Sequence, residues 1–199
     1  MKLMIKKSDL LSTPCDEYNN LPDGKFDAIK EIANRGNHAE HVGWLITNCK
    51  LAQTTKMLEY FKSLKPLIKD IGSLIKNCKL VQTPKMLAYY KSFKPSVNDV
   101  CWLITSCRFA QTTKVLSYYK SLNPSAENVS WLIRNCKFTQ TSQMLKYYKS
   151  LKPSAYNVIL LITSCRFAQT TKMLEYFKSL NPPIKDIYWL INNRKFANR

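Results

Sequence analysis

Apolar residues recur along most of the chain at helical spacing, and the same pattern returns every 29 residues. Each 29-residue unit holds two such stripes. In residues 125–153, the first stripe is Ala126, Val129, Leu132, Ile133 and Cys136. The second stripe is Met144, Leu145, Tyr148 and Leu151. Residues three and four apart share one face of a helix, so the pattern predicts an all-α chain built from two-helix repeats.

Two constant columns set the period. The cysteine column is Cys49, Cys78, Cys107, Cys136 and Cys165, with Arg194 in the sixth place. The proline column is Pro66, Pro95, Pro124, Pro153 and Pro182. No insertion shifts either column, so we predict five repeats and a closing half repeat: 38–66, 67–95, 96–124, 125–153, 154–182 and 183–199. Stacked units of this kind form an α-solenoid of helix-turn-helix repeats.

Polar residues at fixed places predict where the helices begin. Ser96, Ser125 and Ser154 stand before the first helix of their repeats, here called helix A, and serine is a favoured N-cap. The second helix, helix B, is predicted to follow a threonine column of Thr54, Thr83, Thr112, Thr141 and Thr170. Pro84 follows Thr83, and proline is tolerated at the first position of a helix. The Asn-Pro or Lys-Pro pair at the end of each repeat stops helix B.

The N-terminal residues lack this pattern. Residues 1–24 mix polar residues, Pro and Gly without periodicity, and they predict a loosely ordered leader. Residues 25–37 predict a short amphipathic helix, which falls where the helix B of a preceding repeat would lie. We therefore expect 25–37 to cap the array at its N-terminal end, and the half repeat 183–199 to cap its other end.

Positive charge is concentrated in the repeats. The chain has a formal net charge of +18, and residues 41–199 hold 25 Lys or Arg against six Asp or Glu. An excess of one sign this large favours an anionic partner: a nucleic acid, an acidic protein or an anionic membrane. No apolar run is long enough for a membrane span, so a membrane partner is not expected.

The cysteines predict a reducing environment. Of seven cysteines, five share one repeat position on an apolar stripe, and no CxxC motif is present. This arrangement predicts small buried thiols and neither a disulfide framework nor a zinc site. Met1–Lys7 lacks the apolar stretch of a secretory signal. We expect the cytoplasm or another reducing compartment, and a monomer.

Catalytic chemistry is not expected. No glycine follows Gly72, which excludes a Gly-rich phosphate loop in the repeats. His38 and His41 lie one turn apart without a third metal ligand nearby. No nucleophile, base and acid stand in a recognisable pattern. We predict no enzyme activity, cofactor, metal or small-molecule substrate.

One basic column recurs just after helix A. This basic ladder consists of Lys50, Lys79, Arg108, Lys137, Arg166 and Lys195. One cation per repeat at constant spacing suits the phosphates of a polyanion backbone, which give affinity and register without sequence preference. A solvated face kept for solubility is the alternative, although solubility does not require a single sign of charge.

Helix A also has a variable stripe, spaced i, i+3 and i+7. Its first column is Glu40, Lys69, Asn98, Glu127, Tyr156 and Lys185. Its second is Gly43, Gly72, Cys101, Ser130, Ile159 and Tyr188. The third, here called the reading column, is Thr47, Lys76, Thr105, Arg134, Thr163 and Asn192. All members of the reading column are able to hydrogen-bond a base edge or a peptide group. Neutral drift on an exposed face is the alternative.

Aromatic residues accompany a column of helix B lysines, which consists of Lys62, Lys91, Lys120, Lys149 and Lys178. The pairs are Tyr60/Phe61, Tyr89/Tyr90, Tyr118/Tyr119, Tyr147/Tyr148 and Tyr176/Phe177, and Trp44, Trp102, Trp131 and Trp189 mark helix A. Stacking on bases is one interpretation. Packing between repeats is the better one, because the second aromatic of each pair lies on the apolar stripe.

The segments Asn128-Val-Ser-Trp-Leu-Ile and Met144-Leu-Lys-Tyr-Tyr-Lys-Ser-Leu-Lys-Pro153 resemble a pentatricopeptide repeat. The resemblance covers residues 38–199. It implies a right-handed α-solenoid that binds single-stranded RNA, one base per repeat. Repeats of that family are longer, partly in helix A, so their base code is not carried over. DNA-binding repeats of the TAL-effector class are less similar, because their Gly-rich reading loop is absent here.

Two functional hypotheses follow. The first is a nucleic-acid-binding repeat protein, RNA before DNA, with the basic ladder on phosphates and the reading column facing bases. The second is a protein-interaction scaffold that binds an acidic partner, including the case of a secreted effector.

Overall fold

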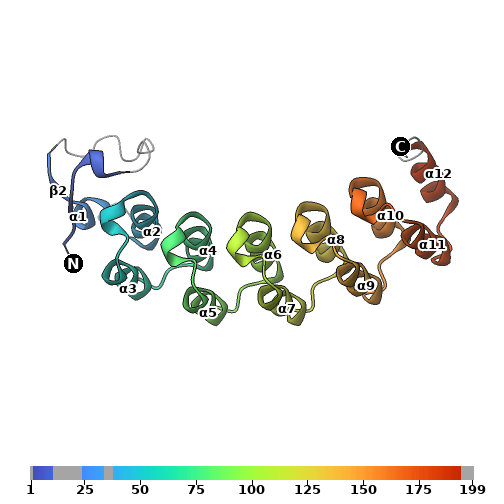
Figure 1. Cartoon of the computed structure of the whole chain (residues 1–199), viewed down its shortest axis with the longest axis horizontal. Coiled ribbons are helices and arrows are strands. Elements are labelled where there is room, and N and C mark those ends of the chain that lie inside the picture. Colours follow the sequence, from blue (N-terminus) through green and yellow to red (C-terminus); the bar gives the residue numbers. More distant parts are fainter. Residues whose placement is uncertain (1, 11–23, 34–37, 194–199) are drawn as a thin grey trace. The chain divides into compact units, whose positions relative to one another are not determined.

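The computed structural model describes residues 2–10, 24–33 and 38–193, and within these ranges the regular secondary structure is almost entirely helical (Figure 1). The chain divides into two compact units, Met1–Pro95 and Ser96–Arg199. The division falls on a predicted repeat boundary, after the second proline of the proline column.

The first unit holds an N-terminal segment and two repeats. Strands β1 (Met4–Ile5) and β2 (Phe26–Asp27) pair antiparallel, with a short turn η1 (Lys7–Asp9) between them. Helix α1 (Ala28–Ala33) packs on α2 (His38–Asn48). The repeats are α2, η3 (Lys50–Ala52) and α3 (Thr55–Ser63), then α4 (Ile68–Asn77), η4 (Lys79–Val81) and α5 (Pro84–Ser92). The sequence pattern did not predict β1 and β2, and residues 11–23 of the expected leader lie outside the described residues.

The second unit holds three repeats and one further helix. The repeats are α6 (Val97–Ser106), η5 (Arg108–Ala110) and α7 (Thr113–Ser121); α8 (Ala126–Asn135), η6 (Lys137–Thr139) and α9 (Ser142–Ser150); and α10 (Ala155–Ser164), η7 (Arg166–Ala168) and α11 (Thr171–Ser179). Helix α12 (Ile184–Asn192) follows. Each helix A packs on the next helix A and on its own helix B, so α8 contacts α6, α10 and α9.

The predicted helix starts are confirmed. In all five repeats, the threonine at the N-cap of helix B accepts a hydrogen bond from the backbone N–H three residues later, as Thr141 does from Met144. Ser96, Ser125 and Ser154 accept the corresponding bond at helix A. Pro84 occupies the first position of α5.

The cysteine column lies just after helix A. The pattern placed Cys136 on the helix A stripe, but α8 ends at Asn135 and Cys136 adopts an extended backbone. A 3-10 turn that the pattern did not predict then leads to helix B. The extended backbone directs each thiol into the core: Cys78, Cys136 and Cys165 donate to the carbonyls of Ile46, Ile104 and Ile133 at 3.9 Å. In these repeats, the thiol is therefore a contact to the preceding repeat of the same unit.

The buried thiols are expected to resist labelling in the native protein. All six described cysteines are buried, and burial raises the pKa of Cys101 to about 11, so that about one molecule in a thousand carries this thiolate at pH 8. In a Cys15→Ser variant, a chromogenic disulfide reagent should therefore react only as guanidinium unfolds the chain. Rapid labelling without denaturant would contradict the buried arrangement.

A residue in the left-handed backbone conformation follows helix B in all five repeats. The residue before each proline has positive φ: 51° at Lys65, 50° at Lys94, 53° at Asn123, 51° at Lys152 and 48° at Asn181. Asparagine tolerates this conformation because its short side chain bonds to the local backbone, whereas lysine has no such compensation. Three of the five helix ends thus carry a residue poorly suited to their backbone.

Replacing Lys152 by Asn is therefore expected to stabilise the protein. The gain should be about 0.5–1 kcal/mol in the free energy of unfolding, because the native backbone at 152 is strained for lysine. Urea titration followed by circular dichroism measures it. The reverse change, Asn123→Lys, should cost a similar amount. A lower midpoint for Lys152→Asn would show that φ does not limit stability here.

Candidate functional site

The basic ladder lies at one end of each repeat. Lys50, Lys79, Arg108, Lys137 and Arg166 are each the first residue of the 3-10 turn that joins helix A to helix B, and all five are exposed. Lys195, the sixth member, lies outside the described residues. The predicted position just after helix A is confirmed for the five described members.

A second set of cations lies at the same end. Lys56, Lys85, Lys114 and Lys172 occupy the second position of their B helices and are exposed. The start of a helix has a partial positive charge, so a lysine there is electrostatically unfavourable. No B helix has an acidic residue in its first turn to offset it.

Acidic residues stand elsewhere in the repeats. Of the six Asp or Glu of residues 41–199, four lie in the first turn of a helix A, where the helix dipole favours them: Asp70, Asp99, Glu127 and Asp186. A helix A of ten residues separates that turn from the basic ladder by about 15 Å. The other two, Glu59 and Glu175, lie in the middle of helix B, and Glu59 pairs with Lys62 at 2.9 Å. The joining turns are therefore purely basic.

Three of the lysines in the last turn of helix B have structural contacts. Lys62 lies over the ring of Tyr89 at 5.5 Å, Lys120 over Tyr147 at 4.9 Å and Lys149 over Tyr176 at 4.8 Å. Each lysine thus covers the first aromatic of the next repeat. The second aromatics, Phe61, Tyr90, Tyr119, Tyr148 and Phe177, are buried. The predicted packing is confirmed for the second aromatic of each pair, whereas the first aromatic is half-buried.

Much of the reading column forms bonds within its own helix. Thr47, Thr105 and Thr163 are half-buried, and their hydroxyls donate to the carbonyls of Gly43, Cys101 and Ile159. Such a hydroxyl keeps only its acceptor capacity for a ligand. Lys76 and Asn192 are exposed.

Arg134, the remaining member of the reading column, leans toward the core. Its Nε is buried, and its positive charge acts on the hydroxyl of Tyr148. Burial raises the pKa of that tyrosine. The structure thus brings the reading column to the same end of the repeats as the basic ladder, but it exposes only part of it.

The second column of the variable stripe is buried in all five repeats. Gly43, Gly72, Cys101, Ser130 and Ile159 are buried, and only Tyr188 is exposed. Three of them lie against the second aromatic of their own helix B. A Cβ at Gly43 would stand 3.2 Å from the ring of Phe61, Cys101 lies beside the hydroxyl of Tyr119, and Ser130 lies beside that of Tyr148. The prediction that the variable stripe forms one shared binding face is therefore wrong for its second column, because this column is buried under the aromatic rings.

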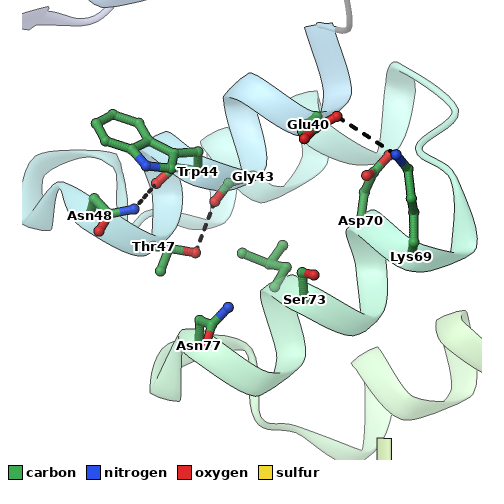
Figure 2. A pocket seen from close by; sticks show the side chains of 10 residues that line it. Glu40, Gly43, Trp44, Thr47, Asn48, Lys69, Asp70, Ser73 and Asn77 are labelled. Atoms are coloured by element: carbon green, nitrogen blue, oxygen red, sulfur yellow. Dashed lines mark hydrogen bonds and ion pairs between the residues drawn. The ribbon is translucent and has the colours of Figure 1, made fainter. Parts of the chain in front are cut away.

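The exposed variable face consists of the first column and three tryptophans, Trp102, Trp131 and Trp189. All six members of the first column are exposed. Figure 2 shows the groove between α2 and α4, a cavity of about 250 Å³. Glu40 and Lys69 face each other there at 3.9 Å, and Trp44 and Thr47 line its wall. Asn48 donates to the Trp44 carbonyl at 2.8 Å, which anchors this end of α2.

A second groove, between α6 and α8, is more aromatic. Trp102 and Trp131 are 39% and 42% exposed, and with Asn98, Glu127 and Asn128 they line a cavity of about 350 Å³. Sequence reasoning assigned these tryptophans to packing and missed their exposure. The signal was present, because Ser73 and Leu160 occupy the same column, and a fully buried tryptophan position rarely accepts serine.

In the part of the chain that the structure describes, no three His, Cys, Asp or Glu side chains are grouped so that they could hold a metal ion. Across residues 2–10, 24–33 and 38–193, no helix combines the length and the apolar character that crossing a membrane requires.

No protein-family model, curated protein or solved structure matches the chain. The resemblance to pentatricopeptide repeats therefore stays a prediction, and the geometry of the repeats carries the functional argument alone.

Proposed function

We propose that this protein is a helical-repeat nucleic-acid-binding protein, with single-stranded RNA preferred to DNA. The purely basic end of the repeats carries the proposal. Five ladder cations lie at this end, and in four of the five repeats a lysine in the first turn of helix B joins them, where its charge opposes the helix dipole. Residues that break a local stability rule in this repeated way are expected at functional sites.

The proposed architecture is a right-handed α-solenoid. Helix A packs on helix A within each unit, which supports stacked hairpins. In such a stack the joining turns follow one another at about 8–10 Å, the usual distance between packed helices. A polyanion backbone then follows the basic ladder, and its phosphates bind Lys50, Lys79, Arg108, Lys137, Arg166 and Lys195.

Bases would meet the exposed face of helix A. Lys76 and Asn192 of the reading column are exposed, and Thr47, Thr105 and Thr163 offer an acceptor oxygen. The half-exposed rings of Trp102 and Trp131 add stacking surfaces, which suit unpaired bases better than a duplex. This part of the proposal explains the preference for single strands.

Binding to a randomised single-stranded RNA pool is expected to fall steeply with salt. Five or six phosphate contacts give a slope of log K against log[salt] of about −4 for single strands. Fluorescence anisotropy at several salt concentrations, with single-stranded and duplex DNA of equal length for comparison, measures the slope and the preference. A slope near zero would rule out the phosphate contacts.

A protein-interaction scaffold is the second candidate, and one observation favours it. The exposed face of helix A in the second unit is aromatic and carries little charge: Asn98 and Trp102 on α6, Glu127 and Trp131 on α8, and Tyr156 on α10. Aromatic side chains are enriched in protein interfaces. An acidic partner would then contact both the aromatic face and the basic ladder. Weak RNA binding together with capture of one acidic protein would favour this candidate.

A further inference from the structure

The end of the second unit exposes a face that every complete repeat buries. On α12, Ile187 is 40% and Ile191 is 56% exposed. The corresponding residues of the five complete repeats are at most 1% exposed: Val42, Ile71, Val100, Val129 and Val158 for the first, and Ile46, Ile75, Ile104, Ile133 and Ile162 for the second. Ile184 and Tyr188, at 71% and 60% exposed, extend the same apolar face.

Among the described residues, no helix B packs beside α12. In each complete repeat, helix B packs on its own helix A, as α11 does on α10. Beside α12 the corresponding space is a cavity of about 540 Å³. Its walls include Leu174, Phe177 and Lys178 of α11 and Ile187, Leu190 and Ile191 of α12. The cavity thus continues an interface that the chain already forms five times.

Lys178 supports the same interpretation independently. Lys120 and Lys149 are half-buried over the tyrosine rings of the following B helices. Lys178 occupies the same position on α11, but it is exposed. A helix B beside α12 would bring a tyrosine under this ammonium group and so add a cation–π contact.

We propose that the face formed by α11 and α12 binds an amphipathic helix of a partner protein. The helix has the chemistry of helix B: Met and Leu at adjacent positions, two aromatics three and four residues after the Met, and Leu seven residues after it. Burial of Ile187, Ile191 and Tyr188 supplies the affinity, and Lys178 covers the first aromatic. This site is distinct from the basic ladder, so it does not depend on nucleic-acid binding.

A peptide with the sequence of residues 170–181 tests the proposal. Labelled with fluorescein, it is titrated with the full chain, and saturable binding is expected. A control peptide in which serine replaces the residues equivalent to Met173 and Phe177 should bind at least about tenfold more weakly, because two buried apolar side chains are lost. Saturation by the control peptide with equal affinity would overturn the proposal.

Two protein variants place the site. Ile187→Glu and Ile191→Lys change exposed side chains, so both should fold, and each should weaken peptide binding by at least about tenfold. Unchanged affinity in both would overturn the site. Sedimentation of the chain alone shows whether a second copy occupies this face. A dimer that Ile187→Glu dissociates would assign the face to self-association and would overturn the proposal of a partner helix.

Discussion

Changing Lys79, Arg108, Lys137 and Arg166 to Ala is expected to weaken single-stranded RNA binding at low salt by at least about 100-fold. A hydrogen bond to a charged group is worth about 1.5–3 kcal/mol, so four of them exceed this effect even if they are far from additive. The salt slope should also become shallower by about 3, because each phosphate contact on a single strand contributes about 0.7. Anisotropy titrations at several salt concentrations measure both quantities. Stability should change little, since all four side chains are exposed.

A matched variant removes four charges from other places. In this variant Asn replaces Lys65, Lys94 and Lys152, which lie beyond the far end of helix B. Ala replaces Lys146, which lies on the exposed side of helix B. A helix B of nine residues places the first three about 14 Å from the joining turns. RNA affinity of this variant should fall less than about tenfold. Equal losses in both variants would show that net charge alone drives binding.

Helix starts and the repeat period followed from local rules that are visible in the sequence. Thr141 and Ser125 cap their helices through bonds to backbone groups three residues away, so each signal is complete within four residues. The proline column likewise ends helix B by local sterics. The ribbon of β1 and β2 was missed for the opposite reason. Its strands have two residues each and lie far apart in sequence, so no alternation shows.

The candidate site was predicted less completely than the fold. The basic ladder was found because one sign of charge in one column is visible without a structure. Gly43 and Ser130 were misjudged because variability in a column suggests exposure, whereas both residues are buried beside an aromatic ring of the other helix. Trp131 was misjudged because an apolar residue on helix A suggests the core, and only its 42% exposure assigns it to the groove.

Replacing Tyr148 by Ala should be among the most destabilising single changes in the second unit. Tyr148 is fully buried, and removing a buried aromatic ring costs about 3–5 kcal/mol through lost contacts and a cavity. Thermal and urea unfolding followed by circular dichroism measure the loss. A cost below about 1 kcal/mol would show that this aromatic is not part of a packed core.

The pairing of Tyr148 with Ser130 predicts a sharper result. Ser130→Ile alone should cost about 1–3 kcal/mol, because it overfills the space and removes the polar group beside the tyrosine hydroxyl. The double variant Ser130→Ile with Tyr148→Phe reproduces the pair that repeat 154–182 uses, Ile159 and Phe177, both of which are buried there. It should recover much of the loss, with a coupling energy of about 1–2 kcal/mol in a double-mutant cycle. Additive losses would mean that the column varies independently of its aromatic partner. Gly43, Cys101 and Ser130 would then again be candidates for residues of helix A that recognise a ligand. Coupling would instead leave the first column and the tryptophans as the surface that distinguishes one repeat from the next.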